Sequence, residues 1–230
     1  MRIRLLVPMM MGLALTAAPA AAKKKAPEPA AAPARAVLPM AVDTDIAHDP
    51  ENVLLLDLSD GGRVAIRLMP EWAPKHVERI KTLANQGFYN GVIFHRVIDG
   101  FMAQTGDPTG TGQGGSQLPD LEAEFNAVPH LRGSVSMART NDPNSANSQF
   151  FIVFYPRFAL DHKYTVFGRV IGGMQYVDAI ERGEPPANPT RVLQASLASA
   201  KRPAPAAPVS PAAPTATGLN ARQLSTPASN

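Results

Sequence analysis

The residues with the clearest potential for chemistry lie in positions 94–104, the run FHRVIDGFMAQ. Arg96 offers five N–H donors on a permanently charged guanidinium. The side chains around it are large and apolar, and a cation on an apolar wall is costly unless it binds a polar group. If this run is a strand, Phe94 and Arg96 share one face. The pattern suits a ligand that is apolar and carries one polar atom to be stabilised.

A second group of candidates lies in positions 148–152, the run SQFFI. In a strand, Gln149 and Phe151 would share one face and their apolar neighbours the other. A buried amide needs a polar partner, so we expect Gln149 to face a polar ligand or an arginine. The apolar side chains with the right size to line a proline-sized pocket are Phe101, Met102, Phe151 and Leu160.

A peptide bond that precedes proline fits both groups. Rotation about this bond faces a barrier of about 20 kcal/mol because the C–N bond has partial double-bond character. A donor directed at the prolyl nitrogen gains strength only when the amide twists and frees the nitrogen lone pair. Arg96 could supply that donor without a nucleophile, a base or a cofactor. Taken alone, Arg96 favours a surface residue in a salt bridge, and it is the second group around Gln149 that favours a binding site.

Other chemistries find little support in the sequence. The five His residues are far apart and show no His-Glu-x-x-His pattern, so we expect no metal. The Gly-rich run at 110–115 lacks the Gly-Lys-Ser/Thr ending of a phosphate-binding loop. The chain also has no Gly-x-Ser-x-Gly elbow, which disfavours a hydrolase of that type. We therefore expect an activity that uses no cofactor.

The net charge of +3 comes from the two ends of the chain. Residues 51–199 carry 13 Lys and Arg against 15 Asp and Glu, so this part is slightly acidic. A basic total often indicates nucleic-acid binding, but here the basic residues lie outside the globular region. We expect no nucleic-acid partner.

Residues 1–22 have the pattern of a secretory signal peptide. Arg2 and Arg4 precede an apolar stretch at 5–15, and an Ala-x-Ala site predicts cleavage after Ala22. The alternative is an N-terminal membrane anchor, but the apolar stretch is short for a span of about 20 residues. We expect a periplasmic or secreted protein with no stable membrane insertion after cleavage.

Composition divides the rest of the chain into three parts. Residues 23–50 form an Ala/Pro-rich linker and residues 201–230 a Pro/Ala-rich tail, and both should be disordered. Residues 51–200 have globular composition and should form one domain. The Pro-rich parts could alternatively tether the domain to the cell envelope.

The domain reads as strand-rich. Alternating apolar residues at 54–58 and 64–68 predict a hairpin, and Pro74 opens a helix that should end at Gly87. Asn90–Gly91 is a further hairpin signal. The remaining expected elements are strands at 133–138, 149–154, 165–171 and 190–197 and a second helix at 174–180. Many short strands with two helices favour a closed antiparallel barrel.

Four motifs in order resemble those of the cyclophilins, the cyclosporin-binding peptidyl-prolyl cis-trans isomerases. They are FHRVI through GFMAQTGD at 94–107, GSVSMA at 133–138, NSQFFI at 147–152 and YTVFGRV at 164–170. The resemblance runs from about residue 53 to residue 197. It implies a mainly β fold, a closed eight-stranded antiparallel barrel capped by two α-helices, and it is similar to the bacterial periplasmic branch.

The resemblance also implies roles by position. Arg96 would be the catalytic guanidinium, and Gln104 would hold Arg96 and the substrate backbone. Ala138 and Arg139 would hold the residue before proline mainly through backbone groups. The other substrate-binding positions would be His95, Phe101, Met102, Gln149, Phe151, Leu160 and Tyr164.

Three positions depart from the family pattern. Arg139 stands where many cyclophilins have Asn, which adds positive charge at the rim of the groove. Tyr164 replaces a His of the eukaryotic branch, and Ala159 replaces a Trp that binds cyclosporin there. We therefore expect isomerase activity with weak cyclosporin inhibition.

The sequence thus predicts a monomeric prolyl isomerase. Its partners would be proline-containing unfolded or partly folded proteins, and it would act during the folding of exported proteins. The alternative is a cyclophilin-fold chaperone or binding module with little turnover.

Overall fold

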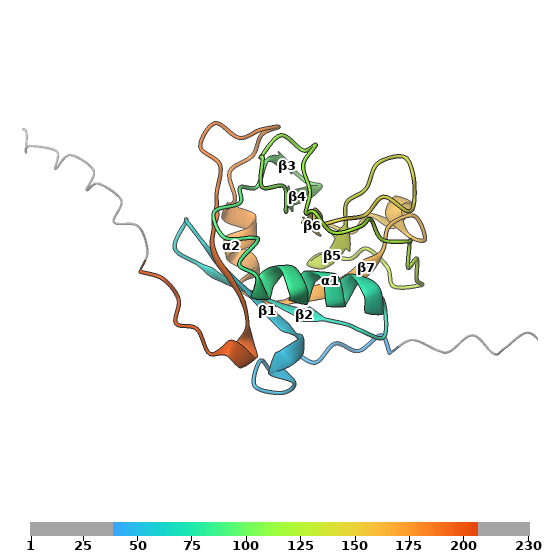
Figure 1. Cartoon of the computed structure of the whole chain (residues 1–230), viewed down its shortest axis with the longest axis horizontal. Coiled ribbons are helices and arrows are strands. Elements are labelled where there is room, and N and C mark those ends of the chain that lie inside the picture. Colours follow the sequence, from blue (N-terminus) through green and yellow to red (C-terminus); the bar gives the residue numbers. More distant parts are fainter. Residues whose placement is uncertain (1–38, 207–230) are drawn as a thin grey trace, which may run out of the picture. The chain divides into compact units, whose positions relative to one another are not determined.

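The computed structural model describes residues 39–206 (Figure 1). The expected signal peptide, most of the expected linker and the tail beyond residue 206 lie outside the described residues. The eight strands are β1 Val53–Leu58, β2 Arg63–Leu68, β3 Arg96–Ile98, β4 Met102–Thr105, β5 Ser134–Met137, β6 Phe150–Val153, β7 Val166–Gly172 and β8 Val192–Leu197. The helices are α1 Pro74–Asn85 and α2 Met174–Ala179, with short 3-10 turns η1 Pro50–Asn52, η2 Phe158–Leu160 and η3 Ala198–Ala200.

All eight strands belong to one antiparallel sheet in the order β3-β4-β6-β5-β7-β2-β1-β8. The sheet is a curled half-barrel with β3 and β8 at its edges, so the expectation of a closed barrel is wrong. The segment 183–191 meets β3 and the chain before it through the isolated bridges Val97–Gly183 and Ile93–Arg191 rather than through a ladder. Three prolines in that segment lack the N–H group that a continuous ladder requires, which explains the open edge.

The predicted hairpin and helices are confirmed. Leu56 pairs with Val64 across β1 and β2, in the register that the alternating apolar residues require. Helix α1 begins at Pro74, whose fixed φ suits the first helical turn. Its apolar stripe is fully buried, and α1 packs against β7 and β8. In contrast, the expected hairpin at Asn90–Gly91 is wrong, because no strand precedes this turn.

The two faces of the site strands belong to two different apolar clusters. Val97 of β3 and Phe150 of β6 point into the main core, while Phe151 belongs to a smaller cluster on the outer face. Phe94 is fully buried in the main core and precedes β3, so the expectation that it shares a face with Arg96 is wrong. Side chains of this outer cluster line the candidate site.

Part of the expected disordered linker is folded against the domain. Arg67 is buried and its guanidinium donates to the backbone carbonyls of Asp43, Asp45 and Asp49. The indole N–H of Trp72 donates to the Pro39 carbonyl at 2.8 Å. Charge-assisted donation to several carbonyls satisfies a buried arginine, so the packed region begins before the expected boundary at residue 51.

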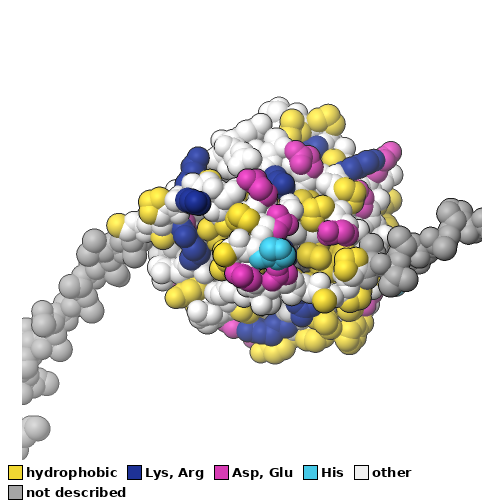
Figure 2. Space-filling model, turned by 90° about the horizontal axis from the view of Figure 1, so that it is seen from below, with side chains coloured by type: hydrophobic (Ala, Val, Ile, Leu, Met, Phe, Trp, Pro, Cys, Tyr) yellow, Lys and Arg dark blue, Asp and Glu magenta, His cyan; other side chains and the backbone are white. Residues whose placement is uncertain are grey.

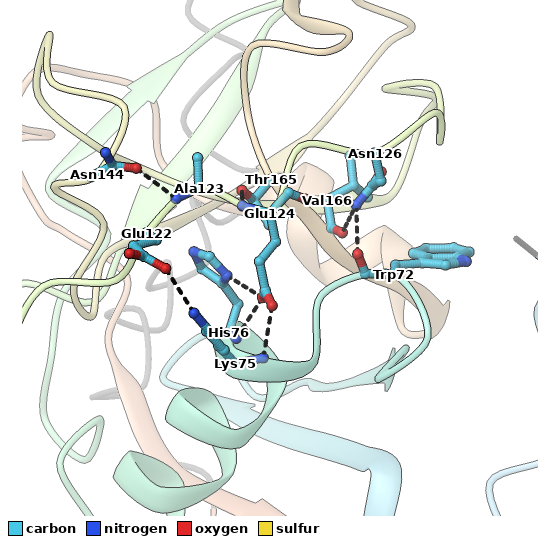
Figure 3. Close-up of polar contacts among 10 residues, drawn as sticks. All are labelled: Trp72, Lys75, His76, Glu122, Ala123, Glu124, Asn126, Asn144, Thr165 and Val166. Atoms are coloured by element: carbon cyan, nitrogen blue, oxygen red, sulfur yellow. Dashed lines mark hydrogen bonds and ion pairs between the residues drawn. The ribbon is translucent and has the colours of Figure 1, made fainter. Parts of the chain in front are cut away.

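The start of α1 is fixed from outside the helix (Figure 3). Its N-cap, Ala73, has no capping side chain. Instead, Glu124 accepts from the backbone N–H groups of Lys75 and His76 at 3.2 and 3.1 Å and from Nδ1 of His76 at 2.6 Å. Glu122 pairs with the Lys75 ammonium at 2.8 Å. Loop 119–128 therefore supplies the acceptors that the first helical turn needs.

The surface carries both signs of charge. On the face seen in Figure 2, Lys and Arg side chains lie among Asp and Glu, without a large area of one sign. This agrees with the near-neutral balance of residues 51–199. Within residues 39–206, no helix is long and apolar enough to cross a membrane.

Candidate active site

A cavity of about 120 Å³ opens on the outer face of the sheet at β3, β4 and β6. Its lining consists of Arg96, Phe101, Met102, Gln104, Ala138, Arg139, Phe151, Leu160 and Tyr164. Every one of these residues is a sequence-predicted site residue. They come together because β4 pairs with both β3 and β6, while η2 supplies Leu160 at the side.

Apolar side chains form one part of the lining, beside Arg96, Gln104 and Arg139, and they are well supported. Met102 and Phe151 are almost fully buried and pack with Val153 in the outer cluster. The Phe151 ring meets Tyr164 edge-on at 5.6 Å and is stacked with His130 at 6.4 Å between centroids. Such contacts on both sides hold a ring in one orientation. The cavity is therefore suited to a compact apolar group.

Arg96 lies at the mouth of this cavity. It is directly opposite Gln104 in the β3–β4 pairing, and its side chain is 43% exposed. Its Nε donates to Oε1 of Glu184 at 2.6 Å. The salt bridge that the sequence left open is therefore present, and Arg96 also lines the small cavity. The N–H groups on its two Nη atoms remain for a ligand.

Gln104 and Gln149 contact each other rather than Arg96. Gln104 Nε2 donates to Gln149 Oε1 at 2.8 Å, and Gln149 Nε2 donates to the carbonyls of Gly112 and Gly114. Among the described residues, no hydrogen bond joins the Gln104 side chain to the Arg96 side chain. The expected arginine or ligand partner of the Gln149 amide is therefore replaced by Gln104 and a loop. Gln149 borders a second, larger cavity instead of the small one.

The second cavity, of about 650 Å³, adjoins the first and shares Gln104, Ala138, Arg139 and Tyr164 with it. The rest of its lining is mainly polar and comprises residues 112–116, Asp120, Thr140, Asn141, Ser145, Asn147 and Gln149. A bound chain could therefore place an apolar group in the small cavity and a neighbouring polar part in the large one.

Asp107 organises the loop that borders the larger cavity. It accepts from Thr109, from its backbone and its hydroxyl, and from the backbone N–H groups of Gly112 and Gly114. Burial alone would raise the pKa of Asp107, but these hydrogen bonds outweigh it and bring the pKa to about 2. A Cβ on Gly114 would lie 2.1 Å from the Asp107 carboxylate, so only glycine fits there.

His95 lies behind the site and does not line either cavity. It is 5% exposed, and neither ring nitrogen has a hydrogen-bond partner among the described residues. Burial lowers the pKa of His95, which keeps the ring neutral. A Cβ on Gly112 would lie 3.6 Å from the ring, so His95 supports the loop from below.

Arg139 separates the two cavities and is held on several sides. Its guanidinium lies 4.7 Å from the Tyr164 ring centroid and 5.9 Å from that of Phe125. It donates to the carbonyls of Lys163 and Thr140 at 2.8 Å each. These contacts keep the predicted positive charge at the rim of the groove.

Two acidic residues with a clear place at the site were not predicted. Glu184 contacts Arg96, and Asp107 holds the loop beside the larger cavity. The Asp107-Pro-Thr-Gly run carries a turn signal that could have indicated a carboxylate capping a loop. Nothing local marks Glu184, which is 88 residues from Arg96 in the sequence. Within residues 39–206, no cluster of His, Asp or Glu is arranged to hold a metal ion.

Comparison with known sequences shows which family this chain matches. Residues 53–197 match the family described as cyclophilin type peptidyl-prolyl cis-trans isomerase/CLD. A probable peptidyl-prolyl cis-trans isomerase of Brucella suis is 49% identical over 173 residues, 68% of this chain and 88% of the relative. Peptidyl-prolyl cis-trans isomerase-like 3 of Rattus norvegicus is 46% identical over 128 residues, 54% of this chain and 79% of the relative.

Solved structures agree with the sequence comparison. The cyclophilin AquaCyp293 of Hirschia baltica is similar with a TM-score of 0.62 and 32% identity, over 67% of this chain and 77% of that one. A cyclophilin-type isomerase of Cryptosporidium parvum, solved in the presence of the dipeptide Ala-Pro, has a TM-score of 0.59 and 28% identity. That match covers 63% of this chain and 98% of the other.

Proposed function

This chain belongs to the cyclophilin family and is a peptidyl-prolyl cis-trans isomerase, and from this premise we propose its catalytic mechanism and its cellular role. The observation that carries the mechanism is the position of Arg96, which lines the same cavity of about 120 Å³ as the apolar side chains of Met102 and Phe151. The proline ring of a substrate occupies this cavity against Met102 and Phe151. The peptide bond before it then lies beside Arg96.

Arg96 lowers the rotational barrier by a hydrogen bond that becomes strong only in the transition state. In the planar amide the prolyl nitrogen lone pair is delocalised and accepts poorly. As the bond twists, the lone pair localises, and a guanidinium N–H donates to it. No covalent intermediate forms. Shortening a step of tens of seconds to milliseconds requires about 6 kcal/mol, which one charged donor, the exclusion of water by the bound substrate and substrate orientation supply together.

The larger cavity receives the chain next to the proline. Its polar lining suits a peptide backbone, and Arg139 stands at the junction of the two cavities. Ala138 and Arg139 hold the residue before proline. The Ala-Pro dipeptide used with the Cryptosporidium relative supports a ligand of this chemistry.

The setting we propose is the folding of exported proteins by a monomeric enzyme. The support is the signal-like sequence at residues 1–22, which lies outside the described residues. Cell fractionation and N-terminal sequencing test this point. The expected result is a periplasmic or secreted protein that begins at Lys23; a protein retained in the cytoplasm with its Met1 end intact would contradict it.

Exchange spectroscopy of a peptide with one X–Pro bond tests the mechanism. The full chain should accelerate cis/trans exchange, and Arg96→Ala should remove most of the acceleration while the peptide still binds. Equal exchange rates with both proteins would overturn the role of Arg96. Binding without acceleration by the wild-type chain would favour the alternative of a chaperone or binding module.

A further inference from the structure

The guanidinium of Arg96 is fixed at one point only. Its Nε donates to Oε1 of Glu184 at 2.6 Å, and this is its one side-chain hydrogen bond to another described residue. A charge-assisted bond of this length has well-defined geometry. Because it uses Nε, it leaves the N–H groups of both Nη atoms for the cavity. Glu184 lines neither cavity, so it contacts Arg96 without occupying the space open to a ligand.

The backbone keeps Glu184 beside β3. Gly183 and Val97 exchange two hydrogen bonds of 2.8 and 2.9 Å, which form an isolated antiparallel bridge on the open edge of β3. Gly183 has a φ of 146°, and a Cβ there would lie 2.6 Å from the Cα of Pro186. Only glycine suits this position. The bridge places the next residue, Glu184, next to the strand that carries Arg96.

We propose that Glu184 is a positioning residue for the isomerisation, and this inference rests on the proposed function of Arg96. Its carboxylate holds the guanidinium through Nε so that the Nη donors face the prolyl nitrogen. The family resemblance assigns this task to Gln104, but here the Gln104 amide donates to Gln149 instead. The geometry points to Glu184 as the residue that orients the arginine in this chain.

The ion pair acts through orientation rather than through stability. Both side chains are about half exposed, 43% for Arg96 and 51% for Glu184. Exposed pairs of this kind contribute little to the free energy of unfolding because water screens them. The same screening limits how far the carboxylate weakens the positive charge of Arg96. A small misplacement of a catalytic donor, in contrast, has a large effect on rate.

Kinetics of two variants of the full chain test the proposal. Glu184→Ala should lower kcat about fivefold with little change in KM, because the donor is lost only from the transition state. Glu184→Gln keeps an acceptor oxygen and should recover most of the rate. The matched control is Asp99→Ala, which breaks the 3.3 Å pair between Asp99 and Arg182, two residues before Glu184, and should leave kcat unchanged. An unchanged or higher kcat in Glu184→Ala overturns the proposal.

The NMR signal of the Arg96 Nε–H group gives a readout that is independent of turnover. In the wild-type chain and in Asp99→Ala it should be shifted downfield and exchange slowly with water. In Glu184→Ala it should move to the position of a free arginine and exchange faster. A signal that does not change in Glu184→Ala overturns the contact itself. If the wild-type chain fails to accelerate X–Pro exchange, the proposed function falls, while this signal still reports whether Glu184 holds Arg96.

Discussion

Two glutamates of this chain accept hydrogen bonds from basic side chains in very different surroundings. Glu124 lies at the start of α1, where its side chain is 15% exposed and its partner His76 is fully buried (Figure 3). Glu184 lies at the mouth of the candidate site, and both it and Arg96 are about half exposed. Glu124 satisfies three donors, two of them backbone N–H groups, whereas Glu184 satisfies one.

The difference in exposure between the two glutamates predicts that one affects mainly the stability of the domain and the other mainly its activity. A buried donor without a partner costs free energy in the folded state, so contacts like those of Glu124 are expected to determine the free energy of unfolding. An exposed donor can turn to water, so the pair at the mouth adds little stability and leaves Arg96 accessible to a substrate. Changes at the two places should therefore appear in different measurements.

The largest expected effect is the loss of activity in Arg96→Lys. Lysine keeps the charge but presents it as a point on a flexible stem, without the planar fork and without Nε. We expect kcat/KM for an X–Pro peptide to fall about a hundredfold. Urea unfolding should change by less than about 0.5 kcal/mol, because the side chain is half exposed. A stability loss as large as the loss of transition-state stabilisation would remove the distinction between the two regions.

The opposite result is expected for Glu124→Ala. Two backbone N–H groups of the first helical turn and Nδ1 of His76 lose their acceptor, so the free energy of unfolding should fall by about 2 kcal/mol. Because neither α1 nor Glu124 contributes a side chain to the lining of either cavity, kcat at a temperature where the variant is folded should stay at the wild-type value. Glu124→Gln, which keeps an acceptor oxygen, should lose less. A fall in kcat without a fall in stability would contradict this assignment.

Much of the fold could be predicted from local pattern. The alternation in β1 and β2, the Pro74 helix start and the β3–β4 turn at Asp99–Gly100 are short-range signals, and the structure has all three. The small cavity was predictable because its lining comes from a few runs whose residue types already suit a proline. The roles of the individual lining residues in substrate binding and catalysis remain predictions.

What could not be predicted depends on the path of the chain in space. Glu184 meets Arg96 across 88 residues, and only the Gly183–Val97 bridge brings them together. The open edge of the sheet follows from prolines whose position opposite β3 is not visible in sequence. The segment before residue 51 has linker-like composition, yet it is folded because Arg67 binds its carbonyls.

Acid should destabilise the domain through two buried histidines. Burial lowers the pKa of His76 and of His130, although hydrogen bonds to Glu124 and Asp161 raise it in part. The Nε2 atoms of both rings are buried without a partner among the described residues, so neither ring accepts a second proton readily. The unfolded chain titrates near 6.5 and binds these protons more tightly. The two neutral histidines therefore contribute fully to the free energy of unfolding above pH 6.5, and this contribution is lost as the pH falls below 6.5.

Urea unfolding between about pH 5 and pH 8 measures this dependence. The free energy of unfolding should decrease below pH 6.5, and His76→Gln should make the decrease smaller. The control is His48→Gln, because His48 is exposed and its pKa is raised by Asp43, which gives a dependence of opposite sign. A decrease that is the same in His76→Gln and in the wild-type chain would show that His76 is not its source.

The smallest effect is expected within the network of Figure 3 itself. Lys75 pairs with Glu122 at 2.8 Å, close to Glu124, but both side chains are largely exposed. Lys75→Met removes this pair and keeps the backbone N–H that Glu124 accepts. Since exposure rather than proximity decides the contribution, the free energy of unfolding should change by less than about 0.5 kcal/mol. A loss as large as that of Glu124→Ala would show that the network acts as one unit, and burial would then no longer explain why the two glutamates differ.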